Sequence, residues 1–283
     1  MTNKKKAAFT SIIAAIFLTT MKFVVGILTS SLGILSEALH SLLDLLAALI
    51  TFVSVSISDK PADKQHQYGH GKIENLSAFF ESILLVVTCI WIIYEGVSRL
   101  VSGNTTVKVT VWSYLVVLTA MAVDLGRSRM LFKAAKRNNS QALEADAIHF
   151  STDILSSGVV LLGLVCANLG YHKADAISAL GVAVIVLGIS YRLGKRAIDV
   201  LLDKVPEGLT EKVESKLKSN KEIVYYHNLK IRVAGPDTFV EVNIHLQPQT
   251  DLETAHGICN RIEKDMETLI PRCTTIVHAE PDE

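Results

Sequence analysis

Apolar residues along this chain gather in six long runs, followed by a stretch with shorter, alternating patterns. The runs cover residues 7–28, 31–57, 76–97, 111–125, 147–169 and 174–193. About 20 consecutive apolar residues form a helix long enough to cross a bilayer. We therefore expect about six transmembrane helices in residues 1–205. A signal peptide is the alternative for the first run, but that run contains Lys22 and continues without an obvious cleavage site.

The pattern changes near Pro206 and predicts a small cytoplasmic α+β domain over residues 206–283. Helices are favoured where apolar residues fall on one face, and strands where they alternate with polar ones. These criteria predict helices at 207–219 and 252–269 and strands at 225–233, 238–246 and 274–277. Gly235, Pro236 and Asp237 mark a turn between the first two strands. The α-β-β-α-β order is typical of an open-faced, metallochaperone-like sandwich.

Charge is distributed unevenly, although 28 Lys and Arg balance 28 Asp and Glu in the 283 residues. Residues 1–205 hold 19 basic and 14 acidic residues, whereas residues 206–283 hold 9 and 14. Most basic residues between the runs fall on the side of the N-terminus, which predicts that both termini are cytoplasmic. No basic cluster interleaves with aromatic residues, which argues against nucleic-acid binding. The four cysteines form no CxxC motif, so we expect reduced thiols.

Two of the apolar runs carry the same pair of polar residues. His40 and Asp44 stand four residues apart in the second run, and His149 and Asp153 repeat this spacing in the fifth. Residues four apart share one helix face, and ionisable groups at membrane depth are costly enough to be functional candidates. Two imidazoles and two carboxylates suit a tetrahedral zinc site. Hydrogen-bonded packing is the alternative for either pair alone.

Six of the seven remaining histidines form two further groups on the cytoplasmic side, and His172, in an outward-facing loop, is assigned no role. Asp63, His66 and His70 lie in the loop after the second run, where a solvated His-rich loop is the alternative. The tail contains five more candidate metal ligands: His227, His245, His256, His278 and Glu280. Imidazole is the commonest neutral ligand for zinc-like metals. His227 or His256 could instead be a surface residue. Cys259 is an additional candidate ligand, but a thiol packed in the core is the favoured interpretation.

These segments together resemble the cation diffusion facilitator family, and most closely its bacterial YiiP-like efflux branch. The resemblance covers nearly the whole chain and is carried by SLGILSEALHSLLD, PADKQHQYGHGK, ADAIHFSTD and IVHAEPDE. It implies a homodimer with a transport site between the second and fifth spans, a loop site and tail metal sites. It also implies a charge pair near the membrane surface that helps to hold the dimer, with Lys72 and Asp203 at the matching positions.

Two residues depart from the bacterial prototype, which has Asp at both positions: His40 and Glu280. Exchange of a carboxylate for an imidazole favours zinc over manganese or magnesium, and the longer arm of Glu280 alters the geometry of the tail site. We therefore expect a transporter that exchanges zinc for protons across the lipid of a bacterial inner membrane. Transport of Fe2+, Mn2+ or Cd2+ is the alternative within the same family.

Two other function classes use the same residues. An intramembrane metalloenzyme would employ Glu37 as a general base beside a metal-bound water. Four protein ligands would leave no open position for that water, and the chain has no HExxH motif. We therefore expect no enzyme activity. A metal-sensing membrane scaffold would bind the same ions without transporting them, and a flux measurement separates it from a transporter.

Overall fold

The computed structural model describes residues 3–28, 32–102, 111–168 and 174–282. The chain divides into two compact units, of which the first comprises Met1–Lys60 and Ile73–Ile198. The second unit comprises Asp199–Glu283 together with the loop Pro61–Lys72. This loop therefore groups with the tail although it joins two long helices. The division into a transport domain at 1–205 and a tail domain at 206–283 stays a prediction.

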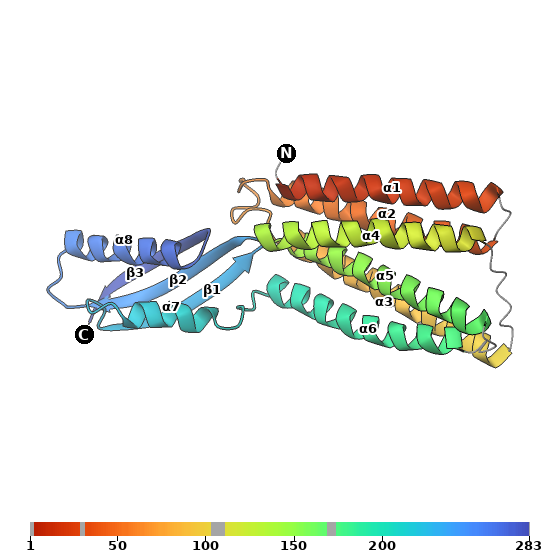
Figure 1. Ribbon diagram of the computed structural model, residues 1–283. Helices are drawn as coiled ribbons and strands as arrows, with labels where there is room; N and C mark the ends of the chain where they lie inside the picture. The colour runs from red at the N-terminus through yellow and green to blue at the C-terminus, as the bar shows by residue number, and fades with distance from the viewer. Residues whose placement is uncertain (1–2, 29–31, 103–110, 169–173, 283) are drawn as a thin grey trace. The chain divides into compact units, whose positions relative to one another are not determined.

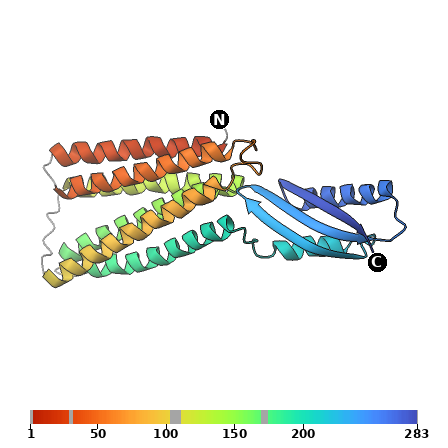
Figure 2. The same cartoon turned by 180° about the vertical axis from the view of Figure 1, so that it is seen from behind.

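In the ranges that the structure describes, the first unit is built from six long helices (Figure 1). Their bounds are α1 Asn3–Leu28, α2 Leu32–Ser58, α3 Ile73–Ser102, α4 Val111–Asn138, α5 Gln141–Asn168 and α6 Ala174–Leu201. α1 packs along α2 and α4, and α5 packs against α4, α3 and α2 (Figure 2). This packing brings α2 and α5, which carry the two repeated polar pairs, into contact.

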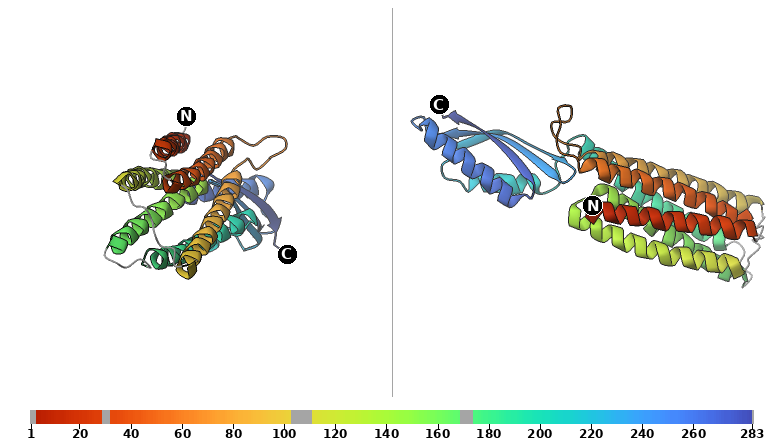
Figure 3. Two further views of the ribbon diagram at one scale, coloured as in Figure 1. Left: turned by 90° about the vertical axis from the view of Figure 1, so that its right-hand side faces the viewer. Right: turned by 90° about the horizontal axis from the view of Figure 1, so that it is seen from above.

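Two apolar clusters hold the helices together. One is formed by α1, α2, α4 and α5 around the fully buried Phe150 and Leu131. The other joins α3 and α6 with α5, through Leu85, Leu193 and Ala145, and the end-on view in Figure 3 shows α3 beside α6. Small residues such as Ala145 let helix backbones approach closely where lipid provides no hydrophobic driving force.

Among the described residues, four helices are long and apolar enough to cross a membrane. They are Asn3–Leu28, Glu37–Ser58, Ile73–Ser98 and Ile177–Leu201. The described residues form six long helices, of which four meet the criterion of length and hydropathy, so the number of six spans stays a prediction. α4 and α5 fall outside this criterion. The predicted fourth run ended at residue 125, but α4 continues to Asn138, and Leu131 and Ala135 in its later turns pack into a buried cluster.

The second unit has the predicted α-β-β-α-β order. Its elements are α7 Leu209–Lys218, β1 Tyr225–Ala234, β2 Asp237–Leu246, α8 Leu252–Leu269 and β3 Cys273–Pro281. β2 lies in the centre of the sheet, antiparallel to β1 and parallel to β3. β3 is longer than the predicted strand, because its pairing with β2 continues from Cys273 to Pro281.

The sheet buries one face and leaves the other partly open. Alternate residues of β2, including Val240, Val242 and Ile244, join a core with Leu217 of α7 and Ile262 of α8. The residues between them are half-buried and lie on the opposite face, because successive strand residues point to opposite sides. The odd-numbered positions of β2 are therefore the ones available for binding.

Candidate metal-binding sites

The two polar pairs of α2 and α5 come together inside the helical unit. Asp44, His149 and Asp153 each offer a ligand atom within 4.8 Å of the others. Nε2 of His149 lies 3.2 Å from Oδ1 of Asp44 and 3.7 Å from Oδ2 of Asp153. Nε2 of His40 lies 3.9 Å from Oδ1 of Asp44 and 4.0 Å from Oδ1 of Asp153. His40 thus lies at the edge of the group and faces both carboxylates.

These distances suit a small tetrahedral ion. Ligand bonds of about 2.0 Å place the ligand atoms of a tetrahedral zinc site about 3.3 Å apart. The separations between ligand atoms in this group run from 3.2 Å, close to this value, to 4.0 Å. Nδ1 of His149 is buried and has no hydrogen-bond partner among the described residues, whereas Nε2 faces the carboxylates.

A buried lysine lies on α1 beside this helix face. The sequence alone allows Lys22 to extend its amino group toward the headgroups, but only 6% of its surface is exposed. Its Nζ donates to Oγ of Ser41 at 2.7 Å and lies 3.2 Å from Oε2 of Glu37. Glu37 is therefore engaged in an ion pair, which does not support the general-base role that the metalloenzyme hypothesis requires.

A second buried polar group was missed by sequence reasoning. Arg127 of α4 lies 3.2 Å from Asp124, donates to Ser11 of α1 at 3.0 Å and stacks 3.4 Å from the ring centroid of Phe150. Ser11 in turn donates to Asp146 of α5. The available signals were the spacing of Asp124 and Arg127, and of Asp146 and His149, because residues three apart share a helix face.

The predicted loop group forms within the second unit. Nδ1 of His66 and Nε2 of His70 each lie 3.4 Å from a different oxygen of Asp63, and the two imidazole rings are 4.5 Å apart. Backbone N–H groups of His66 and Gln65 donate to Asp63 and hold the pKa of that carboxyl below its ordinary range. The carboxylate is therefore charged and correctly placed to share a cation with both rings.

A third group lies on the open face of the sheet. His227, His245 and Glu280 offer ligand atoms within 4.8 Å of one another. Nε2 of His245 is 3.2 Å from Nδ1 of His227 and 3.5 Å from Oε2 of Glu280, so the longer glutamate arm reaches the histidines. Asn243 donates to Glu280 at 2.7 Å, and Asp282 lies 3.8 Å from His245; neither residue was predicted from the sequence.

The remaining tail candidates lie outside this group of three. His278 is on β3, with Nε2 3.5 Å from Oε1 of Glu280, and its side chain is two-thirds exposed. His256 lies on α8 and contacts Asn260 at 3.2 Å. Cys259 packs against the core on the covered face of the sheet. Within one chain, the structure therefore does not bring His256 or Cys259 to the histidine pair, and a ligand role for His256 stays a prediction.

Two other predicted features can be located. Nζ of Lys72 lies 2.8 Å from Oδ1 of Asp203, so these residues form an ion pair within one chain.

Cys89, Cys259 and Cys273 are free thiols, and the side chain of Cys166 lies outside the described residues.

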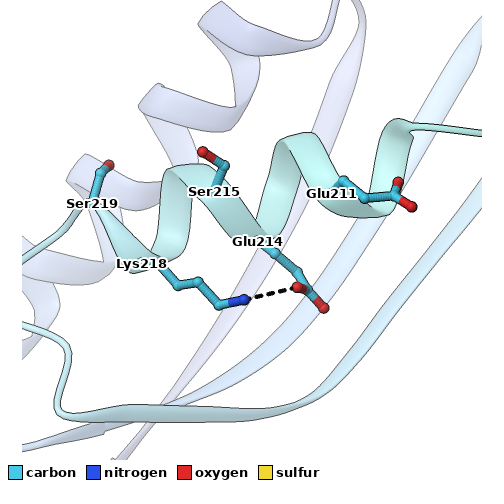
Figure 4. Close-up of a pocket in the computed structure, with 5 residues that line it drawn as sticks. All are labelled: Glu211, Glu214, Ser215, Lys218 and Ser219. Carbon is cyan, nitrogen blue, oxygen red and sulfur yellow. Dashed lines mark hydrogen bonds and ion pairs between the residues drawn. The ribbon is translucent and has the colours of Figure 1, made fainter.

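A surface hollow beside α7 has a different character. It is lined by Glu211, Glu214, Ser215, Lys218 and Ser219 (Figure 4). Lys218 donates to Glu214 at 3.0 Å, and the lining contains no histidine or cysteine. This hollow therefore lacks the ligand chemistry of the three groups described above.

Comparisons with known proteins cover both parts of the chain. The family described as "Cation efflux transmembrane domain" matches residues 8–202, and "Cation efflux protein, cytoplasmic domain" matches residues 205–282. The cation-efflux pump FieF of Yersinia enterocolitica is 27% identical over 280 residues, covering 98% of this chain and 92% of the relative. FieF of Escherichia coli O1:K1 is 29% identical over 279 residues with the same coverage. A solved structure of CzrB, a proposed zinc transporter, matches 28% of this chain and 99% of its own, with 27% identity and a TM-score of 0.27.

Proposed function

Because the chain belongs to the cation diffusion facilitator family of cation efflux proteins, we propose that it exports a divalent metal ion, preferentially Zn2+, in exchange for protons. The observation that carries this proposal is the convergence of Asp44, His149 and Asp153 from α2 and α5, with His40 beside them. Two imidazoles and two carboxylates at tetrahedral spacing favour zinc over harder ions.

Transport requires the substrate site to open to each side of the membrane in turn. We infer that all six helices cross the bilayer of a bacterial inner membrane, with both termini and the tail in the cytoplasm. α4 and α5 can cross despite their polar residues, because Asp124, Arg127 and Asp146 face the bundle interior and find partners there. Rocking of the helices around the site formed by α2 and α5 then exposes the ion outward.

Proton exchange follows from the chemistry of the same ligands. An imidazole or carboxylate binds metal only without its proton, so protons and metal compete for the site. His40 and His149 supply two groups that can carry protons back as the ion leaves. In a scaffold that only sensed metal, binding would persist but no ion would cross.

The loop and tail groups support regulation by the exported ion. Asp63, His66 and His70 present one carboxylate and two imidazoles, and the tail group presents a similar donor set. These donors fit zinc, and the buried Nδ1 atoms of His70 and His245 have no hydrogen-bond partner among the described residues. We propose that metal at these groups stabilises a homodimer, which the pair Lys72–Asp203 also supports near the membrane surface.

The deciding experiment measures zinc flux into sealed proteoliposomes that contain the purified full chain and a pH gradient. Asp153→Asn should abolish zinc flux and the accompanying proton movement. Asp199→Asn is the matched control, because Asp199 lies on α6 in an ion pair with Lys204 and should leave flux unchanged. Zinc binding without flux in the parent protein would identify a sensor, and normal flux in Asp153→Asn would reject the site.

A further inference from the structure

The loop that carries Asp63, His66 and His70 is held against the tail sheet by an aromatic ring. Cζ of Arg232 lies 3.4 Å from the ring centroid of Tyr68. The same ring meets Phe239 edge to face, with centroids 5.2 Å apart and planes at 89°. Arg232 and Phe239 are cross-strand partners on β1 and β2. The loop thus docks on a site built by two tail residues that are distant from it in the sequence.

A backbone contact holds the following part of the loop. Gly71 lies so close to the carbonyl of Ala234 and to Gly235 that a Cβ atom on Gly71 would collide with the main chain. Gly235 itself has a φ of 62° at the turn between β1 and β2. Lys72, the next residue, donates to the carbonyl of Leu201 at 3.2 Å in addition to its ion pair. The loop is therefore docked along its second half.

This docking bears directly on one of the metal ligands. A local turn orders Asp63 and His66, because the carboxylate of Asp63 accepts the N–H groups of Gln65 and His66. His70 lies outside that turn, between the docked residues Tyr68 and Gly71. Its side chain is only 10% exposed, compared with 57% for His66. The position of His70 relative to Asp63 therefore depends on contacts with the tail.

The guanidinium of Arg232 packs against two aromatic rings. Its Nη2 is buried without a hydrogen-bond partner among the described residues. Arg232 faces the rings of Tyr68 and, at 5.3 Å, Phe239. A cation against an aromatic face is stabilised by the negative charge of that face, more strongly where water is excluded. Tyr68 of the loop therefore stabilises the guanidinium of Arg232, and the same contact holds the loop on the sheet.

We propose that Arg232 and Phe239 of the tail are positioning residues for the loop metal group, with Tyr68 as the side chain through which they act. The inference rests on the proposed function, since it requires Asp63, His66 and His70 to bind a divalent cation. Tail contacts preorganise His70 and so raise the affinity of the loop site. Because coupling between binding equilibria is reciprocal, metal at the loop also strengthens its docking on the sheet.

The test uses the full chain in detergent, in a background of Asp153→Asn and His245→Ala that disables the other two groups. Zinc affinity is measured by competition with a chelating dye at pH 7. Arg232→Gln and Tyr68→Ala should each weaken zinc binding about fivefold or more, the size expected for loss of a cation–π contact. Tyr68→Phe keeps the ring and should stay within about twofold of the background.

Two controls separate the possible failures. Arg261→Gln removes another tail arginine, one that pairs with Glu222 on the surface, and should leave zinc affinity unchanged. Asp63→Asn removes a loop ligand and should abolish the measured binding. If Asp63→Asn lowers affinity but Arg232→Gln and Tyr68→Ala do not, the positioning role is rejected and the loop site stands.

If Asp63→Asn has no effect, the loop does not bind zinc, and both that part of the proposed function and this inference fail. Tyr68 is half exposed, so Tyr68→Ala carries the test even if Arg232→Gln unfolds the tail. Hydrogen exchange of α8 amides identifies such unfolding, because α8 does not contribute to the docking contacts.

Discussion

Nε2 of His149 on α5 lies 3.2 Å from Oδ1 of Asp44 on α2, and this contact joins two helices that are distant in the sequence. Asp153 approaches the same imidazole from one turn further along α5. Nε2 of His149 can donate one hydrogen bond at most, whereas the two carboxylates beside it offer four acceptor oxygens. A divalent cation at this point would satisfy all three groups, which supports the proposed metal site.

The first prediction concerns the contact itself. Asp44→Ala should reduce zinc transport by more than the roughly 10–100-fold that loss of an outer-shell partner costs a metal site. Zinc flux in proteoliposomes measures the effect. Glu144→Ala is a suitable control, because Glu144 lies on α5 in a surface pair with Arg196. Equal flux in Asp44→Ala and the parent protein would contradict a shared site on α2 and α5.

The second prediction concerns metal selectivity. In the parent protein, Nε2 of His40 lies at the edge of the group, about equally far from Asp44 and Asp153. His40→Asp replaces this nitrogen ligand by oxygen. Carboxylate ligands suit harder ions, so the ratio of zinc to manganese transport should fall. Competition between the two ions in the flux measurement gives this ratio. An unchanged ratio would show that His40 does not contact the transported ion.

Local patterns were sufficient to predict most elements, but not contacts between distant residues. α8 begins and ends at the predicted residues, because its apolar stripe and the capping residue Asp251 are both local signals. The end of β3 was underestimated, since its last residues are held by pairing with β2. The histidine–aspartate spacing singled out residues of α2 and α5 that the structure brings together, and their role as metal ligands stays a prediction. The docking of Tyr68 was not foreseen, because its partners lie more than 160 positions away.

The third prediction concerns a buried ion pair that ties together the ends of four helices. Nζ of Lys4 on α1 lies 2.7 Å from Oε1 of Glu74 on α3 and 2.6 Å from Asp59. Ser58 and Ser140 also donate to Glu74, which is 1% exposed. Removal of Glu74 takes one of two carboxylates from the buried amino group of Lys4, and a hydrogen bond to a charged group contributes about 1.5–3 kcal/mol.

Glu74→Ala should therefore lower the thermal unfolding midpoint of the purified protein clearly. Glu144→Ala, which removes a half-exposed carboxylate, should have a small effect. Equal midpoints for Glu74→Ala and Glu144→Ala would show that the pair contributes nothing to stability.

The fourth prediction is a pH dependence at the start of α8. Asp251 accepts hydrogen bonds from the N–H and Oγ1 of Thr254, and these bonds lower the pKa of its carboxyl below 3.8. A lowered pKa in the folded state means that the stabilisation is fully present above the ordinary pKa and is lost as pH falls through the lowered one.

Asp251→Asn retains an oxygen acceptor but does not titrate in this range. Wild type should therefore be more stable than Asp251→Asn at pH 7, and the difference should shrink as the pH falls below 3.8. Calorimetry of the full chain in detergent follows the unfolding of the tail. A difference that stays constant between pH 7 and pH 2.5 would contradict the charged cap.

The last prediction concerns the close approach of the loop to the sheet. Gly71→Ala would place a methyl group against the carbonyl of Ala234, and a main-chain atom cannot yield as the end of a side chain can. The loop should therefore move away from the sheet, which hydrogen exchange of residues 61–72 would record as faster exchange. Gly257→Ala is the control, since its nearest neighbour is the flexible end of Arg261 at 3.9 Å. Unchanged exchange in Gly71→Ala would mean that the loop is not held at this point.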